Sequence, residues 1–205
     1  MSAPYTVVDQ SHWKRAMHCA VFRNCIEPAF CITVELDVTH FYRRIKKLGY
    51  PFTYSLIYLV SQAANEIEEF RYRFLEGQVV LYRRIHTAFT YLNPETELFK
   101  VVNVPLTDTL EEYVALADRT QKEQQEYFTD PLGRDVFQFS PCPGCTTPTS
   151  PTPTPETRTT PPRCLTGENG KSGRESICCP FPSRPTTPLW TGCMWPVWWK
   201  KFKIR

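Results

Sequence analysis

The sequence contains no uninterrupted run of about 18 apolar residues, the length that a membrane-spanning helix needs. Its start, Met-Ser-Ala-Pro-Tyr, lacks the basic and apolar regions of a secretory signal. Histidine is scarce, with 4 in 205 residues, and His86 is the last of them. We therefore expect no membrane span and no export signal, and only the first part of the chain can supply a histidine for catalysis.

The composition changes near Pro141. Residues 1–141 carry 15 Lys and Arg against 18 Asp and Glu, whereas residues 142–205 carry 9 against 3 and are strongly basic. The second part also holds 12 of the 19 prolines, 6 of the 9 cysteines and 4 of the 5 tryptophans. Proline fixes φ and removes a backbone donor, so its density over 142–166 excludes helix and sheet interior. We predict a globular domain over 1–141 and an irregular or disordered tail over 142–205 that packs no core with it.

The periodicity of the first part is that of mixed helices and strands. Apolar residues at every second position predict a half-buried strand over 30–38, and apolar residues at helical spacing predict a buried helix over 53–69. Thr109 and Glu112 have the spacing of a capping box, which predicts a helix from there to about residue 127. The other predicted elements are helices at 11–23 and 39–48 and strands at 78–82, 86–92, 99–104 and 136–140. This order predicts an α/β or α+β layered domain.

Several short segments of the first part occur in a specific order and spacing. They are Trp-Lys-Arg at 13–15, Phe-Cys-Ile-Thr-Val-Glu-Leu-Asp-Val-Thr at 30–39, Tyr-Pro at 50–51, Ile-Tyr-Leu-Val-Ser-Gln-Ala-Ala-Asn at 57–65, Phe-Arg at 70–71, Thr90, Glu-Thr-Glu at 95–97, Phe99, and Phe-Gln-Phe-Ser at 137–140. Over about residues 5–141 the chain thereby resembles the chloramphenicol acetyltransferases. The resemblance implies an α/β fold, the N-terminal part of a two-layer CoA-dependent acyltransferase sandwich with a mixed sheet.

The resemblance also implies roles for individual residues. Ser140 matches the family serine that helps to stabilise the tetrahedral intermediate, and Arg15 matches an arginine that pairs with an aspartate near the C-terminus. The positions that match the chloramphenicol pocket are Phe22, Ile26, Phe30, Thr90 and Phe99. The residues by themselves leave plainer alternatives open, because a serine at a strand end can bond to backbone and aromatic residues at such spacing are mostly core.

The resemblance stops where the family carries its catalytic base. Family members continue to a His-His-x-x-x-Asp-Gly motif, whose second histidine takes the proton of the 3-hydroxyl of chloramphenicol, and this hydroxyl attacks the thioester of acetyl-CoA. Residues 142–205 contain no histidine. The chain's own histidines, which are more simply explained as surface or packing residues, are His12, His18, His40 and His86. Of these, His86 precedes the strand of Thr90 and is the first candidate for a substitute base.

The genetic code offers an explanation of the tail. A gene segment written for Gln-Thr-His-His-Ser-Leu-Val-Asp-Gly-Met-His-Val-Ala and read one base out of frame can encode residues 184–196, Arg-Pro-Thr-Thr-Pro-Leu-Trp-Thr-Gly-Cys-Met-Trp-Pro. We interpret residues 142–205 as a frameshifted C-terminus, a non-native addition to a truncated domain. In this interpretation Thr191 stands where the aspartate partner of Arg15 would be, so we expect Arg15 to lack that partner.

Other interpretations of the tail fit its pattern less well. A zinc ribbon needs two regularly spaced cysteine pairs, and here the second pair is adjacent. A secreted disulfide scaffold, a proline-rich arm that binds partners and an interfacial membrane segment at 195–205 are further alternatives. The cysteines considered for the zinc ribbon are Cys142, Cys145, Cys164, Cys178 and Cys179.

The resemblance implies a cytoplasmic antibiotic-resistance enzyme that transfers the acetyl group of acetyl-CoA to chloramphenicol without a metal. It also implies a homotrimer, in which the pocket of one subunit faces the base of the next. Because the base motif is missing, we expect this chain to lack the activity. We expect no nucleic-acid partner and no membrane partner, and the alternative function is that of a non-catalytic interaction protein with a proline-rich arm.

Overall fold

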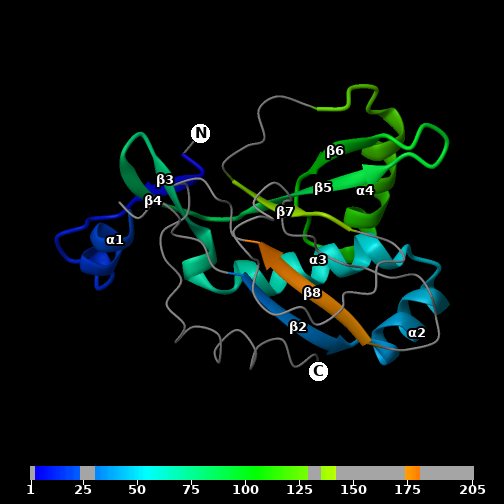
Figure 1. Cartoon of the computed structure of the whole chain (residues 1–205), viewed down its shortest axis with the longest axis horizontal. Helices are drawn as coiled ribbons and strands as arrows, with labels where there is room; N and C mark the ends of the chain where they lie inside the picture. The colour runs from blue at the N-terminus through cyan, green and yellow to red at the C-terminus, as the bar shows by residue number, and fades with distance from the viewer. Residues whose placement is uncertain (1–2, 24–30, 129–134, 142–173, 181–205) are drawn as a thin grey trace, which may run out of the picture.

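The computed structural model describes residues 3–23, 31–128, 135–141 and 174–180, and the fold is given for these ranges (Figure 1). The helices are α1 (Ala16–Arg23), α2 (Thr39–Leu48), α3 (Phe52–Asn65) and α4 (Leu110–Glu123), with a short 3-10 helix, η1 (Glu68–Arg71), after α3. The strands are β1 (Tyr5–Val7), β2 (Cys31–Asp37), β3 (Tyr72–Leu75), β4 (Gln78–Tyr82), β5 (His86–Leu92), β6 (Phe99–Val104), β7 (Val136–Phe139) and β8 (Arg174–Pro180).

These strands form three sheets. The first has the order β1-β4-β3 and is antiparallel throughout, and the second is the antiparallel pair of β2 and β8. The third has the order β6-β5-β7 and is mixed, because β5 runs antiparallel to β6 and parallel to β7. The fold is thus α/β with a mixed sheet, as the sequence predicted. None of the helices in the described ranges combines the length and the apolar character of a membrane span.

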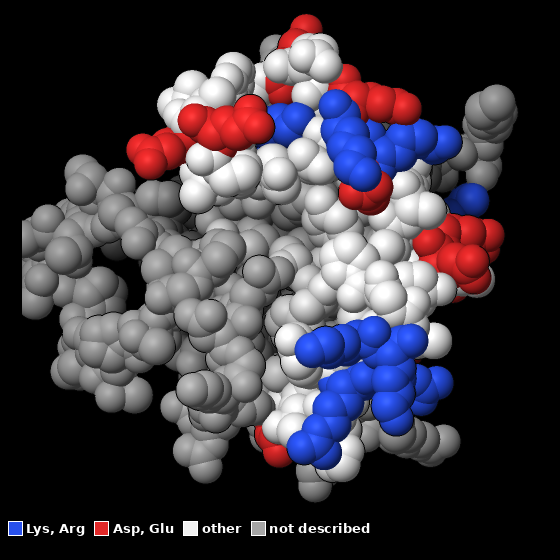
Figure 2. Space-filling model, turned by 90° about the vertical axis from the view of Figure 1, so that its right-hand side faces the viewer, with Lys and Arg blue, Asp and Glu red and all other residues white. Residues whose placement is uncertain are grey.

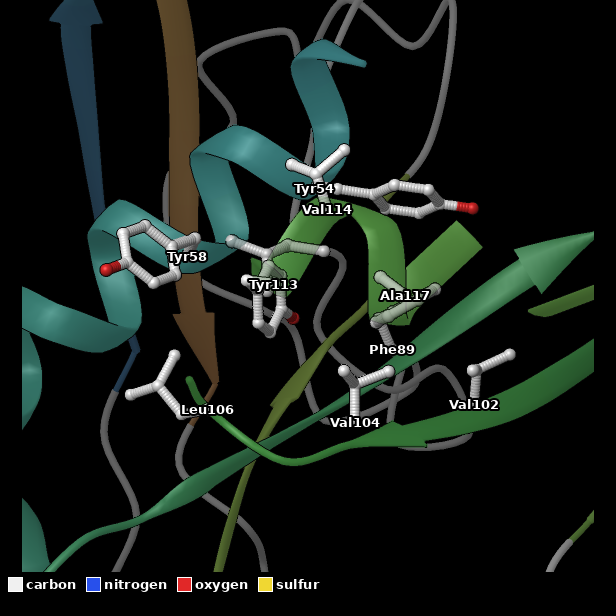
Figure 3. Packing of buried hydrophobic residues seen from close by; sticks show 10 residues of the cluster. Tyr54, Tyr58, Phe89, Val102, Val104, Leu106, Tyr113, Val114 and Ala117 are labelled. Atoms are coloured by element: carbon white, nitrogen blue, oxygen red, sulfur yellow. The ribbon is translucent and has the colours of Figure 1, made fainter. Parts of the chain in front are cut away.

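Helix α3 is the centre of the domain because it is apolar on two faces. One face supplies Tyr54, Ile57 and Tyr58 to a cluster that it shares with β5, β6 and α4 (Figure 3). Another face supplies Phe52, Leu56 and Val60 to a cluster that also contains Leu36 and Val38, at the end of β2. The helix therefore lies between the β2–β8 pair and the mixed sheet (Figure 1).

The predicted elements are all present, and some of them have altered ends. Helix α1 begins at Ala16 rather than near residue 11, because the carboxylate of Asp9 accepts hydrogen bonds from the backbone and hydroxyl of Ser11 and holds a turn there. Helix α3 ends at Asn65 because Ile67 is buried in an extended conformation. The side chain of Thr109 accepts a hydrogen bond from the backbone of Glu112 at 3.3 Å, which confirms the predicted start of α4.

Three short strands were not predicted: β1, β3 and β8. The sequence pattern did not predict β3, because Arg73 interrupts its apolar residues. In the structure, however, Arg73 is only 6% exposed. Its guanidinium donates to the backbone carbonyls of Phe70 and Tyr72 and lies 5.7 Å from the ring centroid of Phe137. These contacts compensate for the buried charge.

Strand β8 lies in the segment that was expected to be irregular and to pack no core with the first part. Its residues pair with the whole length of β2, from Cys31 opposite Pro180 to Asp37 opposite Arg174. The sequence Arg-Glu-Ser-Ile-Cys-Cys has no proline before Pro180, and β2 offers the unpaired donors and acceptors of an edge strand. The tail therefore contributes one strand to the fold, and its remaining residues, 142–173 and 181–205, lie outside the described ranges.

Candidate active site

Two hydroxyl groups meet where the parallel pairing of β5 with β7 ends. The register pairs Phe89 with Phe139, so the next residues, Thr90 and Ser140, also lie side by side. The hydroxyl of Thr90 donates a hydrogen bond to Oγ of Ser140 at 3.3 Å, and both residues are half-buried. The parallel pairing of two distant segments is what brings these side chains together.

Thr90 and Ser140 occupy the sheet face opposite the α3–α4 core. Successive residues of a strand point to opposite faces, and the buried Phe89 faces the core cluster. Phe99 shares the face of Thr90, because Thr90 pairs with Val101 and Phe99 lies two residues before Val101 on β6. Such diagonal neighbours are about 7–8 Å apart, within reach of an aromatic ring. This face therefore presents two hydroxyls beside a ring that is 51% exposed.

The ring of Phe99 packs against the ring of Phe128. The two centroids are 5.8 Å apart with the ring planes at 87°, an edge-to-face arrangement. Phe128 also forms an isolated parallel bridge with Val101. The segment after α4 thus adds the ring of Phe128 to that of Phe99 on the sheet face that carries Thr90.

The strand end at Ser140 is held by the residue before it. Phe139 packs against the cluster of α3, β5, β6 and α4 and also against the cluster of β2, α2 and α3. A hydroxyl has one donor and two acceptor positions, so Ser140 accepts from Thr90 and keeps its own proton for another acceptor. A serine fixed in this way can donate a hydrogen bond to an oxyanion that forms above the sheet.

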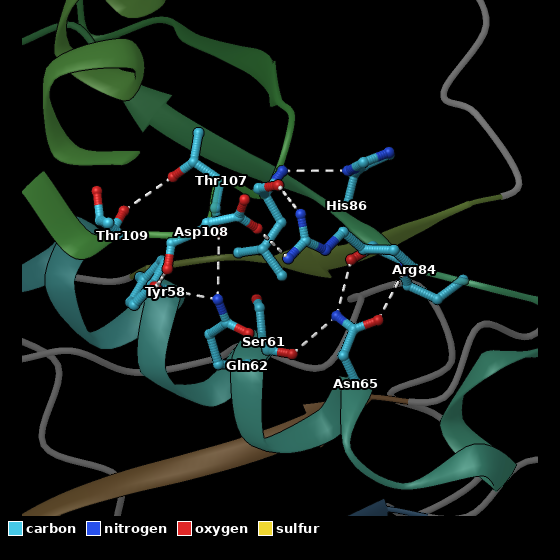
Figure 4. Close-up of polar contacts among 11 residues, drawn as sticks. Tyr58, Ser61, Gln62, Asn65, Arg84, His86, Thr107, Asp108 and Thr109 are labelled. Atoms are coloured by element: carbon cyan, nitrogen blue, oxygen red, sulfur yellow. Dashed lines mark hydrogen bonds and ion pairs between the residues drawn. The ribbon is translucent and has the colours of Figure 1, made fainter. Parts of the chain in front are cut away.

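His86 begins the strand that carries Thr90 but lies at its other end. Their separation of four positions corresponds to about 13 Å along the strand. Nδ1 of His86 accepts a hydrogen bond from the backbone N–H of Leu106 at 3.1 Å, which places the ring proton on Nε2 (Figure 4). Burial is the main cause that lowers the pKa of His86, and Arg84 lowers it further while Asp135 opposes the shift. His86 is therefore a neutral packing residue, out of reach of Ser140.

A network of side chains from α3 and from the segment before β5 fixes the start of β5 (Figure 4). The amide of Asn65 accepts from the backbone N–H of Ile85 at 2.7 Å and donates to the carbonyl of Ile85 at 2.9 Å. Arg84 pairs with Asp108 at 2.7 Å and donates to the carbonyl of Leu106 at 3.1 Å. The sequence did not indicate this network. A helical pattern that ends in Asn65 carries no signal that the Asn65 amide bonds to the backbone of Ile85, 20 residues further on.

Arg15 has a partner that the sequence did not indicate. Its Nη2 lies 2.7 Å from Oε1 of Glu69 in η1, and both side chains are about a quarter exposed. The sequence indicated an aspartate partner near the C-terminus and its loss, and within the described residues the structure pairs Arg15 with this glutamate. The pair ties the turn before α1 to η1, the short 3-10 helix that follows α3.

Of the remaining predicted pocket residues, the structure describes Phe22 alone, and it does not bring Phe22 to the Thr90–Ser140 pair. Phe22 lies on α1 and is 39% exposed. Helix α1 packs through Cys19 onto β3 and β4, whereas the arrowhead of β5, the strand that carries Thr90, lies at the other end of the domain (Figure 1). Ile26 and Phe30 lie outside the described residues. Of the predicted site residues, the structure thus assembles Thr90, Ser140 and Phe99.

Comparison with known proteins identifies the family. The family model described as chloramphenicol acetyltransferase matches residues 3–144, which include every element from β1 to β7. The chain belongs to the chloramphenicol acetyltransferase family. The residues of the Thr90–Ser140 pair both lie within the matched range.

The chain spans little more than half of the length of the curated relatives named first among its matches. Chloramphenicol acetyltransferase 2 of Escherichia coli is 30% identical over 121 residues, which is 59% of this chain and 57% of the relative. A solved chloramphenicol acetyltransferase structure superposes with a TM-score of 0.75 at 25% identity, over 96% of this chain and 97% of the other. A probable dihydrolipoamide acetyltransferase from Listeria monocytogenes superposes with a TM-score of 0.51 at 13% identity, over 96% and 91%, and shares the fold alone.

Proposed function

We propose that residues 1–141 form the truncated domain of a chloramphenicol O-acetyltransferase, which takes the acetyl group of acetyl-CoA. The observation that carries the proposal is the Thr90–Ser140 pair at the end of two parallel strands, within the range that matches the family. In this proposal the 3-hydroxyl of chloramphenicol attacks the thioester carbonyl, and Ser140 donates its proton in a hydrogen bond to the oxyanion. Thr90 orients Ser140, and Phe99 packs against the drug. Phe22, Ile26 and Phe30 complete the pocket, which in a cytoplasmic homotrimer would be shared between subunits.

The reaction also needs a base, and we propose that this chain lacks one. An alcohol has a pKa far above neutrality, so a positioned base contributes on the order of 10²–10⁴-fold to the rate. Residues after His86 include no histidine, and His86 is held as a neutral acceptor by Leu106. Ser140 stabilises negative charge and cannot take its place. The polypeptide as written therefore does not acetylate chloramphenicol.

The proposal accounts for the missing base by a shift of reading frame after Pro141. A single-base insertion or deletion near the codon for Pro141 in the gene is the expected finding. An intact frame would instead favour a protein whose basic, proline-rich tail has its own role, and the pairing of β8 with β2 is the observation that supports this second candidate, a non-catalytic interaction protein.

An assay of thiol release from acetyl-CoA in the presence of chloramphenicol tests both parts of the proposal. It is applied to the chain as written and to a protein whose frame is restored after Pro141, so that His-His-Ser-Leu-Val-Asp-Gly is translated. We expect release above background for the restored protein alone. Activity of the chain as written would show that a residue of the first part serves as the base, and an inactive but folded restored protein would refute the assigned activity.

A further inference from the structure

A buried positive charge lies beside the start of β7. Exposed lysines and arginines form the blue groups on the face of the molecule that Figure 2 shows, whereas Arg73 of β3 is the one charged residue that is buried in the described ranges. Its guanidinium donates to the carbonyls of Phe70 at 2.8 Å and Tyr72 at 2.7 Å, and these two bonds fix its orientation. Arg73 therefore presents a fixed charge to the strand packed against it.

Two residues at the start of β7 interact with this charge. The guanidinium lies 5.7 Å from the ring centroid of Phe137, and the ring of Phe70 meets Phe137 edge to face at 6.3 Å. Burial lowers the pKa of Arg73 to about 10, and Tyr82 and Asp135 oppose that shift. Arg73 thus stays charged at neutral pH, and the carboxylate of Asp135 is close enough to stabilise the charge.

The aromatic residues of β7 do not by themselves determine its register on β5. Strand β7 is the edge strand of the mixed sheet, so among the described strands β5 alone pairs with it. Its core-facing residues are Phe137 and Phe139, two positions apart. A shift of two residues, about 6.6 Å, would put one phenylalanine in the place of the other and keep the same faces. It would also separate Ser140 from Thr90 by that length.

The charge of Arg73 distinguishes the observed register from the shifted ones. A shift in one direction would bring Phe137 to the place of Asp135 and leave the buried charge without this carboxylate, which is costly. A shift in the other direction would put Asp135 in the place of Phe137, against the ring of Phe70 and an apolar cluster that includes Ile85. In the observed register the backbone carbonyl of Asp135 also accepts from the N–H of His86 at 2.7 Å, which begins the pairing with β5.

We propose that Arg73 is a positioning residue for Ser140, which it holds beside Thr90 through Asp135 and Phe137. The inference rests on the proposed function, in which Ser140 donates to the oxyanion. Ser140 lies three positions beyond Phe137, about 10 Å along the strand, so Arg73 acts through β7 and does not touch the reacting atoms. A residue of one sheet thereby sets the geometry of a site on another.

Nuclear magnetic resonance of the full chain as written tests the position of Ser140 without any need for activity. The readout is the through-space contact (NOE) between the methyl group of Thr90 and the β-protons of Ser140. The variants are Arg73→Met, which removes the charge, Asp135→Asn, which removes the carboxylate, and Arg73→Lys, which retains a cation near the ring. Kinetics of the same variants in the frame-restored protein give kcat and KM.

The matched control is Arg23→Met. Arg23 lies 4.9 Å from the ring centroid of Phe74 and donates to the carbonyl of Gly77 at 3.0 Å, so it forms the same kind of contact on the β3–β4 hairpin, away from β7. Thermal melting of every variant separates a loss of stability from a loss of position.

We expect the Thr90–Ser140 contact to be lost in Arg73→Met, weakened in Asp135→Asn, and retained in Arg73→Lys and in the control. In the frame-restored protein, Arg73→Met should lower kcat by about 10- to 100-fold with little change in KM, as a small misplacement of a donor predicts.

An unchanged contact in folded Arg73→Met would overturn the inference and leave the proposed function intact. If Arg73→Met does not fold, Asp135→Asn decides by the same contact. A lost contact with an unchanged kcat would instead overturn the role proposed for Ser140.

Discussion

Thr90 and Ser140 are 50 residues apart in the sequence, and their hydroxyl oxygens are 3.3 Å apart in the structure. The contact exists because β7 returns to the edge of β5 in parallel and in a register that aligns Phe139 with Phe89. The pair is the one polar contact that joins predicted site residues in the described parts of the chain. Substitutions of Thr90 and Ser140 therefore test the proposed roles of the two hydroxyls.

Replacing Ser140 with alanine should lower kcat in the frame-restored protein. The loss of one donor to an oxyanion typically costs about 10²- to 10³-fold in kcat, with little effect on KM. Thr90→Val should cost less, because Ser140 keeps its own proton, and Thr90→Ser should be close to the parent. Steady-state kinetics with Ser11→Ala as the control check this. Equal kcat for Ser140→Ala and the parent would remove Ser140 from the mechanism.

The ion pair of Arg15 and Glu69 should contribute measurably to stability. Both side chains are about a quarter exposed, so we expect a coupling energy of about 1 kcal/mol, towards the upper end for partly solvated pairs. A double-mutant cycle with Arg15→Ala and Glu69→Ala, followed by urea denaturation, measures it. The more exposed pair of Lys122 and Asp118 serves as the control, with about 0.3–0.5 kcal/mol expected. Additive effects of the two Arg15–Glu69 substitutions would contradict the pairing.

His86 should make the native state less stable as the pH falls. Burial lowers the native pKa of His86 below the ordinary value of 6.5. Between that lowered pKa and pH 6.5, the unfolded chain binds a proton that the native chain does not. The His86 contribution is therefore fully present above pH 6.5 and is lost as the pH falls through the lowered native pKa. His86→Asn retains an acceptor for Leu106 and does not titrate.

Urea denaturation at a series of pH values from about 7.5 to about 5 compares His86→Asn with the parent and with His40→Asn, an exposed control. The free energy of unfolding of the parent should fall more steeply with decreasing pH than that of His86→Asn. Parallel curves for the two proteins would show that His86 titrates alike in the folded and unfolded states.

A proline in β8 should weaken its pairing with β2. Backbone donors alternate along an antiparallel strand, so either Ser176→Pro or Ile177→Pro removes a ladder hydrogen bond. We expect one of them to lower the free energy of unfolding by about 1–3 kcal/mol and to speed amide exchange in β2. The control is Thr159→Pro, which adds a proline to a segment already rich in it. The same stability for all three variants and the parent would show that the tail strand does not support the fold.

The sequence by itself was informative where a pattern is local. The bounds of α2, β4, β5 and β6 follow from the apolar period and from punctuation such as Tyr50-Pro51, and the start of α4 follows from Thr109 and Glu112. It also indicated the family, through a resemblance over about residues 5–141. It could not indicate β3, because a buried arginine that bonds to carbonyls looks like a surface residue in the sequence.

Tertiary structure decided which distant residues became neighbours. The register of β5 and β7 brought Thr90 to Ser140, α1 carried Phe22 to the other end of the domain, and Glu69 took Arg15 as its partner. Strand β2 paired with a tail segment that composition had assigned to irregular chain, because an edge strand leaves backbone donors and acceptors to be satisfied. Local sequence therefore determined the helices and most strands, and long-range hydrogen bonding and packing decided the site.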